Sequence, residues 1–225
     1  MPIFLCIETS QSKASVALIK DGICVKEVIT VQQKEQASFL QPAIKDTLDE
    51  AGMSVSEIDA VAVSIGPGSY TGLRVGLASA KGICFAVNKP LITINTLKMM
   101  AYSSRFMMHD HHEFFLAPMI DARRNEVFTA VYDQNLTTCM KPQALILSEA
   151  SYHEFAHQKI CFFGDGSVKW QDQCKISNAI FSELSFSASD MNALTMEAYI
   201  GQIFAPLSSA VPFYGKDFYS TMPRN

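Results

Sequence analysis

A glycine-rich segment at residues 66–82 could hold an anion, because it lies between a predicted strand and a predicted helix. A β-branched strand over 60–65 precedes it, and Ser69 or Thr71 can cap the helix that follows. A glycine turn that opens a helix presents free backbone N–H groups and a positive dipole end, which suits phosphate. The phosphate-loop pattern GxxxxGK[ST] is not met, because no second glycine stands directly before Lys81.

The same segment carries small residues at every fourth position, on one face of the predicted helix. Glycine costs a helix about 1 kcal/mol relative to alanine, so this row needs a compensating contact. A face without side chains lets another backbone approach closely. On spacing alone, a tightly packed helix is favoured over an anion cradle. The row consists of Gly68, Gly72, Gly76, Ala80 and Cys84.

Two histidine groups could bind a metal. Residues 153–157 read His-Glu-Phe-Ala-His, and in zinc peptidases this HExxH pattern supplies two zinc ligands and a glutamate that activates water. So short a match is weak evidence, and the apolar residues around it predict a buried stripe with His153 and His157 on a solvated flank. The second group is His109, His111 and His112. These histidines could also bind a metal, but a polar loop between two elements is the favoured interpretation.

Composition limits the class of protein. The chain has 225 residues, is 48% hydrophobic, and has no apolar run long enough to span a bilayer. Its six cysteines show no CxxC spacing and most lie in apolar stretches, which fits a reducing cytosol, so a cytoplasmic location is expected. The net charge is −4, and only Arg123 and Arg124 are adjacent cations, which argues against extensive unaided nucleic-acid binding.

Hydrophobic periodicity predicts three strands, a helix, a strand and a helix, followed by a second αβ region. Asp21-Gly22 is a strong hairpin signal, and Gly52 is placed to end the first helix, within which Pro42 is awkward. The predicted strands are 3–8, 15–20, 23–31, 60–65, 90–94, 114–120, 126–132 and 160–163. The predicted helices are 39–51, 70–86, 95–108 and 195–204.

Four stretches resemble the TsaB (YeaZ) family, the non-catalytic relatives of the TsaD/Kae1 proteins in tRNA threonylcarbamoyladenosine biosynthesis. Residues 66–82 resemble the family's signature, 5–18 its first hairpin, 118–127 its mid-chain hairpin and 211–218 its C-terminal tail. These stretches span nearly the whole chain in the expected order, so the resemblance is specific. The signature turn consists of Gly66, Pro67, Gly68, Ser69, Thr71 and Gly72.

The resemblance implies an α/β fold of the actin/hexokinase/Hsp70-like (ASKHA) type, with two ribonuclease-H-like lobes of which the second is reduced. Residues 1–98 would form the N-terminal lobe, which carries the partner-binding helices. Residues 99–225 would form a smaller C-terminal αβ lobe whose last helix could pack back on the first.

Active members of that fold bind ATP between the lobes, on one acidic turn from each. Here the first turn lacks glycine and the second contains two arginines, so both phosphate turns are predicted to be degenerate. We favour Glu8 and Asp121 as hairpin-turn acceptors, although Asp121 could instead pair with Arg123 or Arg124. The turns are Glu8, Thr9 and Ser10 in the first lobe and Asp121 and Arg123 in the second.

As the resemblance implies, the chain is a dimerisation and activating subunit of a TsaD threonylcarbamoyltransferase complex that modifies ANN-decoding tRNAs. We expect no catalysis and no cofactor of its own, because ATP and metal are used by partner subunits. The expected partners are TsaD, in a heterodimer, and TsaE, through the TsaD complex. When TsaD is absent, the chain is expected to form a homodimer. It would contact tRNA only indirectly, through the complex, and no membrane binding is expected. The alternatives are a small-molecule kinase or ATPase of the ASKHA fold and, remotely, a zinc peptidase.

Two helices of the first lobe carry the predicted partner face. Paired with their counterparts in a related domain, they could form a four-helix bundle that buries about 800 Å² per partner. Alternatively, both helices cover only their own sheet. The predicted interface residues are Phe39, Leu40, Ala43, Ile44, Tyr70, Leu73, Arg74, Gly76, Leu77 and Lys81.

Overall fold

The chain begins with three antiparallel strands joined by short connections. The computed structural model describes residues 2–30, 36–107 and 114–216. Its first strands are β1 (Ile3–Glu8), β2 (Ser15–Lys20) and β3 (Ile23–Ile29). Asp21 and Gly22 both adopt positive φ, at 57° and 77°, as the tightest hairpin turns require. The predicted Asp-Gly hairpin is therefore confirmed.

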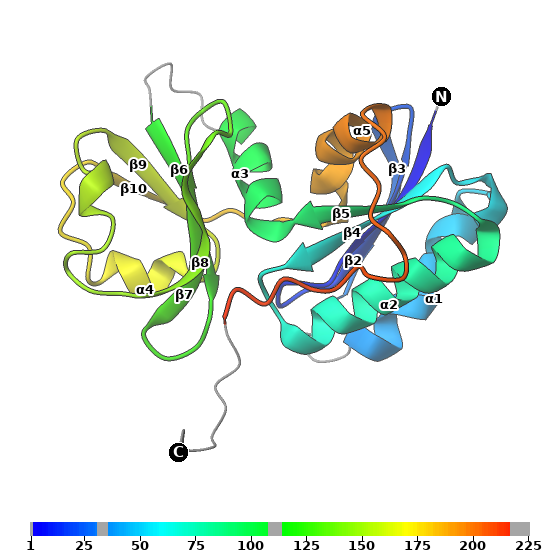
Figure 1. Ribbon diagram of the computed structural model, residues 1–225, viewed down its shortest axis with the longest axis horizontal. Coiled ribbons are helices and arrows are strands. Elements are labelled where there is room, and N and C mark those ends of the chain that lie inside the picture. The colour runs from blue at the N-terminus through cyan, green and yellow to red at the C-terminus, as the bar shows by residue number, and fades with distance from the viewer. Residues whose placement is uncertain (1, 31–35, 108–113, 217–225) are drawn as a thin grey trace.

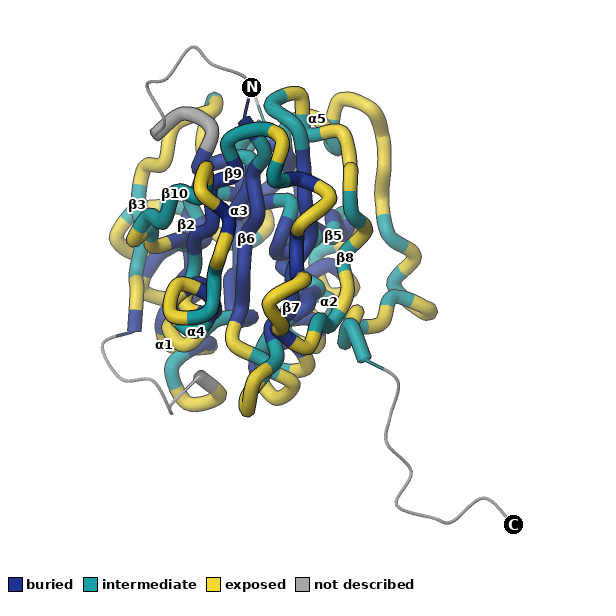
Figure 2. The backbone as a smooth tube through the Cα atoms, turned by 90° about the vertical axis from the view of Figure 1, so that its left-hand side faces the viewer, coloured by how far each residue is buried: buried dark blue, intermediate teal, exposed yellow. Residues whose placement is uncertain are grey.

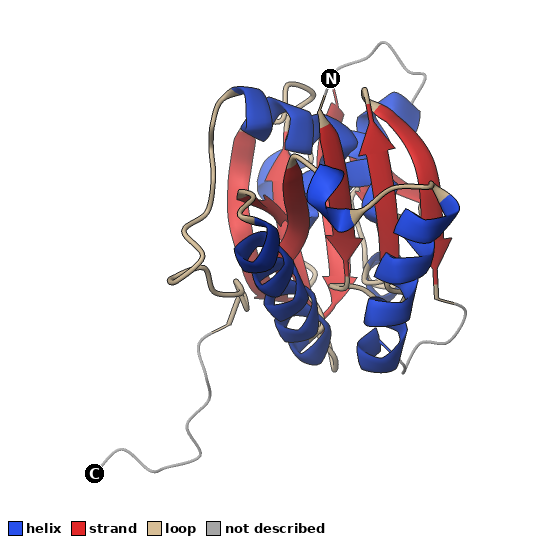
Figure 3. Ribbon diagram, turned by 90° about the vertical axis from the view of Figure 1, so that its right-hand side faces the viewer, coloured by secondary structure: helices blue, strands red, loops and turns tan. Residues whose placement is uncertain are grey.

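Two parallel strands complete the first sheet, whose order is β3-β2-β1-β4-β5 (Figure 1). They are β4 (Ala60–Gly66) and β5 (Leu91–Asn95). The connections to them contain α1 (Gln36–Glu50), the 3-10 turn η1 (Val55–Glu57) and α2 (Tyr70–Val87). In Figure 3, α1 and α2 lie side by side across one face of this sheet.

Helix α1 starts earlier than its periodicity predicted. It begins at Gln36, so Pro42 lies well inside the helix, where it is exposed to solvent. Gly52 follows the helix end with φ of 65°, and Met53 N–H donates to the Leu48 carbonyl oxygen at 3.0 Å. The prediction that Gly52 ends this helix is confirmed.

The second lobe repeats the strand order of the first. Its sheet runs β8-β7-β6-β9-β10, with the same sequence of antiparallel and parallel pairs. The lobe is reduced only in its helices, which are the turn η2 (His153–Phe155) and the short α4 (Ser167–Gln171). Its strands are β6 (Phe114–Asp121), β7 (Glu126–Tyr132), β8 (Thr138–Ile146), β9 (Lys159–Phe163) and β10 (Ala179–Ser182). Figure 2 shows the buried strands of this sheet from its own side of the molecule.

Three further elements lie between the lobes or return to the first lobe. They are α3 (Thr96–Met107), η3 (Ala188–Met191) and α5 (Asn192–Ile200). The predicted lobe boundary at residue 98 falls inside α3. The last helix packs on the first lobe, where the rings of Phe4 and Tyr199 lie 5.1 Å apart edge to face. It begins at Asn192 and ends at Ile200, so it starts and ends earlier than the predicted helix at 195–204.

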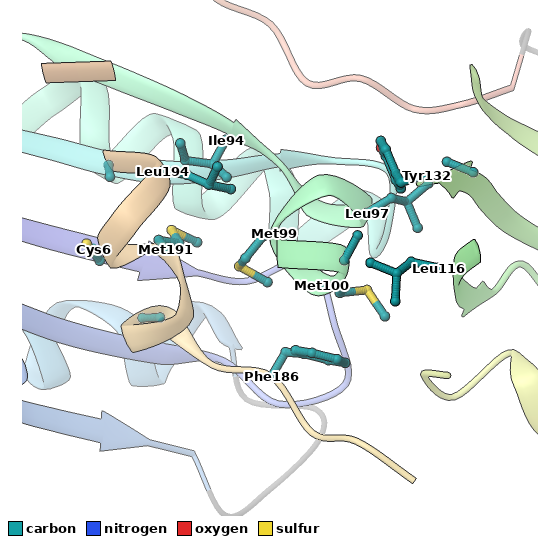
Figure 4. Packing of buried hydrophobic residues seen from close by; sticks show 14 of the residues in the cluster. Cys6, Ile94, Leu97, Met99, Met100, Leu116, Tyr132, Phe186, Met191 and Leu194 are labelled. Atoms are coloured by element: carbon teal, nitrogen blue, oxygen red, sulfur yellow. The ribbon is translucent and has the colours of Figure 1, made fainter. Parts of the chain in front are cut away.

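The alternation of side chains along the first sheet gives it two apolar faces. Leu5 and Ile7 point to the core under α1 and α2, whereas Phe4 and Cys6 point to α3, η3 and α5. The core that contains Phe4 and Cys6 extends into the second lobe, because it also contains Met100 of α3 and Leu116 of β6 (Figure 4). The two lobes therefore share one buried core, in addition to a core of their own in each.

We expect the two lobes to unfold in one transition, because the shared core would be exposed if either unfolded alone. Trp170 is the only tryptophan and is fully buried in the second lobe, so its fluorescence reports on that lobe. The thermal unfolding midpoint measured by Trp170 fluorescence should coincide with the midpoint measured by far-UV circular dichroism, which reports on both lobes. Met100→Ala should lower both midpoints together, at a cost of about 2–5 kcal/mol. Two separate midpoints would show that the lobes are independent.

Candidate functional site

The first candidate phosphate turn lies at the end of β1 and is fully enclosed. Glu8, Thr9 and Ser10 are at most 1% exposed. The Ser10 backbone N–H donates to Glu8 Oε1 at 2.6 Å, and the Ser10 hydroxyl donates to the same oxygen. The carboxylate therefore closes its own turn, and the prediction that Glu8 is a hairpin-turn acceptor is confirmed.

The signature turn packs directly onto this first turn. Ser69 caps α2, because its Oγ accepts from the Gly72 N–H at 3.2 Å, while Thr71 is exposed. The Ser69 N–H donates to the Ser10 carbonyl oxygen at 2.7 Å, and Thr9 Oγ1 donates to the Gly72 carbonyl oxygen at 2.8 Å. Acceptor oxygens thus fill the corner in which an anion would bind.

The glycine row of α2 is explained by this contact. A Cβ at Gly68 would overlap the Ser10 carbonyl oxygen, and a Cβ at Gly76 would overlap Thr9 Oγ1. The prediction that small residues allow a close backbone approach is confirmed. The approaching chain is the Thr9–Ser10 turn of the same lobe.

Burial dominates the electrostatics of Glu8. It raises the pKa of the carboxyl above the ordinary value, although hydrogen bonds from Ser10 oppose the shift. Only one carboxyl oxygen takes part in the turn, since Oε2 is buried without a partner among the described atoms. A charge at this position is therefore costly, and the turn needs only the acceptor.

The second candidate turn is the arginine hairpin, residues 121–126, between β6 and β7. Asp121 Oδ1 accepts from the Arg123 backbone N–H at 2.6 Å, so the acceptor prediction is confirmed here as well. The same oxygen lies 2.6 Å from Lys169 Nζ of α4. Lys169, rather than Arg123 or Arg124, pairs with Asp121, so the alternative of an Asp121–arginine ion pair was wrong. Sequence reasoning missed Lys169 because it predicted no helix at 167–171.

The arginine hairpin holds two bulky residues in the left-handed region. Arg123 has φ of 68° and Arg124 has φ of 50°. For residues other than glycine this conformation costs about 1–2 kcal/mol each. Lys169 Nζ also donates to the Arg124 carbonyl oxygen at 2.7 Å, which helps to fix the turn.

A cavity of about 650 Å³ lies beside the arginine hairpin. Arg123, Arg124, Ile146 and Lys216 are among the residues that line it. Neither guanidinium has a hydrogen-bond or ion-pair partner within residues 2–30, 36–107 and 114–216. Lys216 pairs with Glu126.

Residues 211–216, here called the strap, cross from the first lobe to the second. The Phe213 N–H donates to the Ile65 carbonyl oxygen at 2.7 Å, and the Tyr214 and Tyr70 rings lie 4.9 Å apart. At the other end, Lys216 Nζ lies 5.5 Å from the centre of the Phe128 ring. The strap therefore connects the signature turn to the arginine hairpin.

Most of the predicted partner-interface residues face inward. Leu40, Ala43, Ile44, Leu73, Gly76 and Leu77 are buried in the first lobe. They cannot meet a partner in this structure, because the sheet and the Thr9–Ser10 turn already cover them. The prediction that these six residues contact a partner is therefore corrected. For the other four predicted interface residues it stays a prediction. Tyr70 and Arg74 are exposed, and Phe39 and Lys81 are half-buried.

The outer face of α2 carries a different set of side chains. We call it the docking face and define it as Tyr70, Arg74, Ala78, Gly82 and Phe85. All five are exposed, and Phe85 is 82% exposed. A Cβ at Gly82 would meet nothing within 4 Å, and Arg74 Nη1 donates to Tyr70 Oη at 2.7 Å. The docking face is thus a small-residue stripe bounded by aromatic rings.

The HExxH segment does not form the helix that its zinc chemistry requires. Residues 153–155 are a 3-10 turn, and both histidines are exposed. Of the predicted buried stripe, Tyr152 and Phe155 are buried, whereas Ala156 is only half-buried. His157 Nδ1 lies 2.9 Å from the Glu154 carbonyl oxygen. In the described part of the chain, no group of three histidine, cysteine, aspartate or glutamate side chains is placed to hold a metal.

The second histidine group, His109, His111 and His112, lies outside the described residues.

Among the helices that the structure describes, none is both long and apolar enough to cross a membrane.

The sequence pattern of the family described as TsaD, tRNA N6-adenosine threonylcarbamoyltransferase, matches residues 24–202. The tRNA threonylcarbamoyladenosine biosynthesis protein TsaB of Escherichia coli is 28% identical over 218 residues, which cover 93% of each chain. The protein of the same name from Bacillus subtilis is 30% identical over 128 residues, 57% of this chain and 54% of that protein. The match thus spans about half of the second relative and nearly all of the first.

Solved structures show the same fold. A Pseudomonas aeruginosa protein described as similar to peptidase YeaZ is 25% identical, with a TM-score of 0.82, over 96% of this chain and 100% of that one. The activator of 2-hydroxyisocaproyl-CoA dehydratase from Clostridium difficile, solved with bound ADPNP, has a TM-score of 0.51 at 8% identity. It covers 89% of this chain and 97% of that one, and shows the fold alone. With the two mixed sheets, these likenesses confirm the predicted ASKHA-type fold.

A methyl group at Gly76 should destabilise the protein, because buried Thr9 cannot move without losing its hydrogen bond to Gly72. We expect Gly76→Ala to cost about 1–3 kcal/mol of unfolding free energy, measured by urea denaturation. Gly82→Ala, on the open side of the same helix, is the matched control and should gain up to about 1 kcal/mol. Equal effects at the two positions would contradict the packing argument.

Ionisation of Glu8 should lower the unfolding free energy of the wild-type protein as the pH rises. Its raised pKa means that the folded chain binds this proton more tightly than the unfolded chain does. Glu8→Gln keeps the acceptor and removes the charge, so the variant's stability relative to wild type should rise across the pH range above about 4.5, the ordinary pKa of a glutamate, by at most about 1.4 kcal/mol per pH unit. Thermal midpoints across this range test it, with Glu149→Gln as an exposed control. A difference that does not change with pH would contradict the prediction.

Proposed function

Because the chain belongs to the TsaB/YeaZ family of TsaD-related proteins, we propose that it serves in threonylcarbamoyladenosine formation in tRNA as the non-catalytic partner of a TsaD transferase. In this role it would dock on TsaD and activate it. Transfer chemistry, ATP and metal would belong to the partner subunits.

The closed first turn is the observation that carries the non-catalytic part of this proposal. In working members of the fold, glycines let the backbone approach a phosphate at this position. Here the Ser10 carbonyl oxygen and Thr9 side chain pack on α2, and the Glu8 carboxylate faces inward. A phosphate would meet acceptor oxygens, which repel it.

The second turn supports the same conclusion. Its carboxylate is held by Lys169 and by the Arg123 backbone N–H, and the two following residues are arginines in a fixed turn. Asp121 therefore already has two partners where working members coordinate a metal–nucleotide. This argues against the alternative of a small-molecule kinase.

The docking face supports the partner role. A stripe of alanine and glycine lets a second helix approach closely, and Phe85 supplies a large apolar side chain of the kind that anchors interfaces. Helix α1 lies beside α2, where Gln41 Nε2 donates to Ser79 Oγ at 2.8 Å, so a partner could contact both helices. An ordinary specific interface would bury about 800 Å² here.

The same face would serve a homodimer in isolation, so TsaD and a second copy would compete for it. TsaE would reach the chain only through the TsaD complex, and tRNA would bind mainly to the assembled complex.

Light scattering tests the proposal directly. The chain is mixed with TsaD from the same organism, and we expect a complex at the sum of the two masses. Ala78→Arg combined with Gly82→Arg should abolish it at micromolar concentration, because two long cations would stand in the stripe. Both positions are open, so the variant should keep its thermal midpoint.

Gln143→Arg combined with Ser177→Arg adds the same charge at exposed positions of the second lobe and is the matched control. It should leave the complex intact. If wild type forms no complex, or if both variants bind equally well, the docking proposal is wrong. Magnesium-dependent ATP hydrolysis by the isolated chain would favour the kinase alternative.

A further inference from the structure

The arginine hairpin and its cavity have no part in the proposed docking or in the closed first turn. The cavity of about 650 Å³ lies on the second lobe, between the hairpin, the end of β8 and the strap. Its lining is exposed, since Arg123 and Arg124 lie open to solvent and Ile146 is 69% exposed. It is therefore accessible to a ligand.

Positive side chains outnumber negative ones around this cavity. Lys216 pairs with Glu126, and Lys169 pairs with Asp121. The guanidinium groups of Arg123 and Arg124 have no such partner among the described residues. Two cations are thus left at one cavity of a chain whose net charge is −4.

The backbone beneath these arginines is held by several hydrogen bonds. Lys169 Nζ donates to the Arg124 carbonyl oxygen at 2.7 Å. On the next residue, Asn125 Nδ2 donates to the Leu147 carbonyl oxygen at 2.9 Å, and Gln173 Nε2 donates to Asn125 Oδ1 at 2.7 Å. Backbone strain at residues that are held this firmly is typical of functional sites, where a side chain must be aimed in advance.

We propose that Arg123 and Arg124 bind a backbone phosphate of tRNA in this cavity. A guanidinium donates two parallel N–H bonds to phosphate oxygens, which makes arginine well suited to this ligand. The exposed Ile146 side chain would contact the sugar or base beside that phosphate. This inference rests on the proposed function, because it is the tRNA of that reaction that would be bound.

The openness of the cavity favours a polynucleotide over a free nucleotide. A small-molecule site buries most of its ligand, whereas the arginines and Ile146 stay largely in contact with solvent. A strand lying across the surface needs only such a shallow contact. The site adds one or two phosphate contacts to those that the rest of the complex makes.

The test compares wild type with Arg123→Asn combined with Arg124→Asn. Asparagine accepts the left-handed conformation better than most residues, so the hairpin should keep its fold while both charges are lost. Unmodified tRNA transcript is bound to the complex with TsaD over a series of salt concentrations. The variant should bind about 3- to 10-fold more weakly at 0.1 M salt, and its log–log salt slope should be flatter by about one.

The control is Lys20→Ala combined with Lys141→Ala, which removes two exposed cations away from the cavity. It should leave the affinity and the slope close to those of wild type. Equal losses in both variants, or no loss in the asparagine variant, would overturn the site. Displacement of tRNA by ADP in wild type but not in the asparagine variant would reassign the cavity to a nucleotide and also overturn it.

Assembly is measured separately by light scattering, so the two proposals can fail independently. If no complex with TsaD forms, the proposed function fails. The variants are then compared as isolated chains with the same transcript at about 0.05 M salt, where each phosphate contact contributes most. Loss of binding in the asparagine variant alone would still support the site, and equal binding would overturn it.

Discussion

The close contact between α2 and the Thr9–Ser10 turn is the constraint on which the first lobe depends. Three interactions meet there: the serine cap of the helix, the hydrogen bond from Thr9 to Gly72 and the inward-facing Glu8 carboxylate. The hydrogen bond from Thr9 to Gly72 needs the helix to lie closer to the turn than a side chain at Gly76 would permit, and a side chain at Gly68 would overlap Ser10. The same closeness means that Thr9 and Ser10 fill the space beside Gly68 and Gly76, so this packing contact also supports the proposal that the turn binds no phosphate.

The two lobes reach related turns by the same route and use them differently. Residues 66–69 and 164–167 both lie at the end of the fourth strand of their lobe, both read Gly-x-Gly-Ser, and both start with a glycine of positive φ. Gly68 packs on Ser10 after β1, and Gly166 packs on the backbone at the end of β6. In the first lobe, atoms of Thr9 and Ser10 fill the space beside the glycines. In the second, an acid–lysine pair holds the hairpin and leaves its arginines facing solvent.

Local signals predicted the elements well because they act within a few residues. The strand at 126–132 and the Asp21-Gly22 turn follow from alternation and turn chemistry alone. Strand β8 was missed because Pro142 interrupts it and all its residues are exposed or half-buried, which gives no clear period. The strap was missed because its contacts are all long-range and its residues repeat in no pattern.

The site was harder to predict, because hydrophobicity does not say what covers an apolar face. Leu40 and Leu77 have the character of interface residues, but the sheet beneath them buries both. The glycine row indicated a close approach and could not identify the approaching chain. Lys169 could not be assigned from sequence, since its role depends on a short helix that begins after a glycine turn.

The return of η3 and α5 to the first lobe has a consequence for synthesis. One face of the first sheet is covered by residues 188–200, and β5 also pairs with Ala205 near the end of the chain. A ribosome that adds about 5–20 residues each second needs on the order of ten seconds to make the stretch between β5 and Ala205. During that time the apolar face containing Phe4 and Ile92 lacks this cover, so the nascent first lobe is a natural substrate for a chaperone.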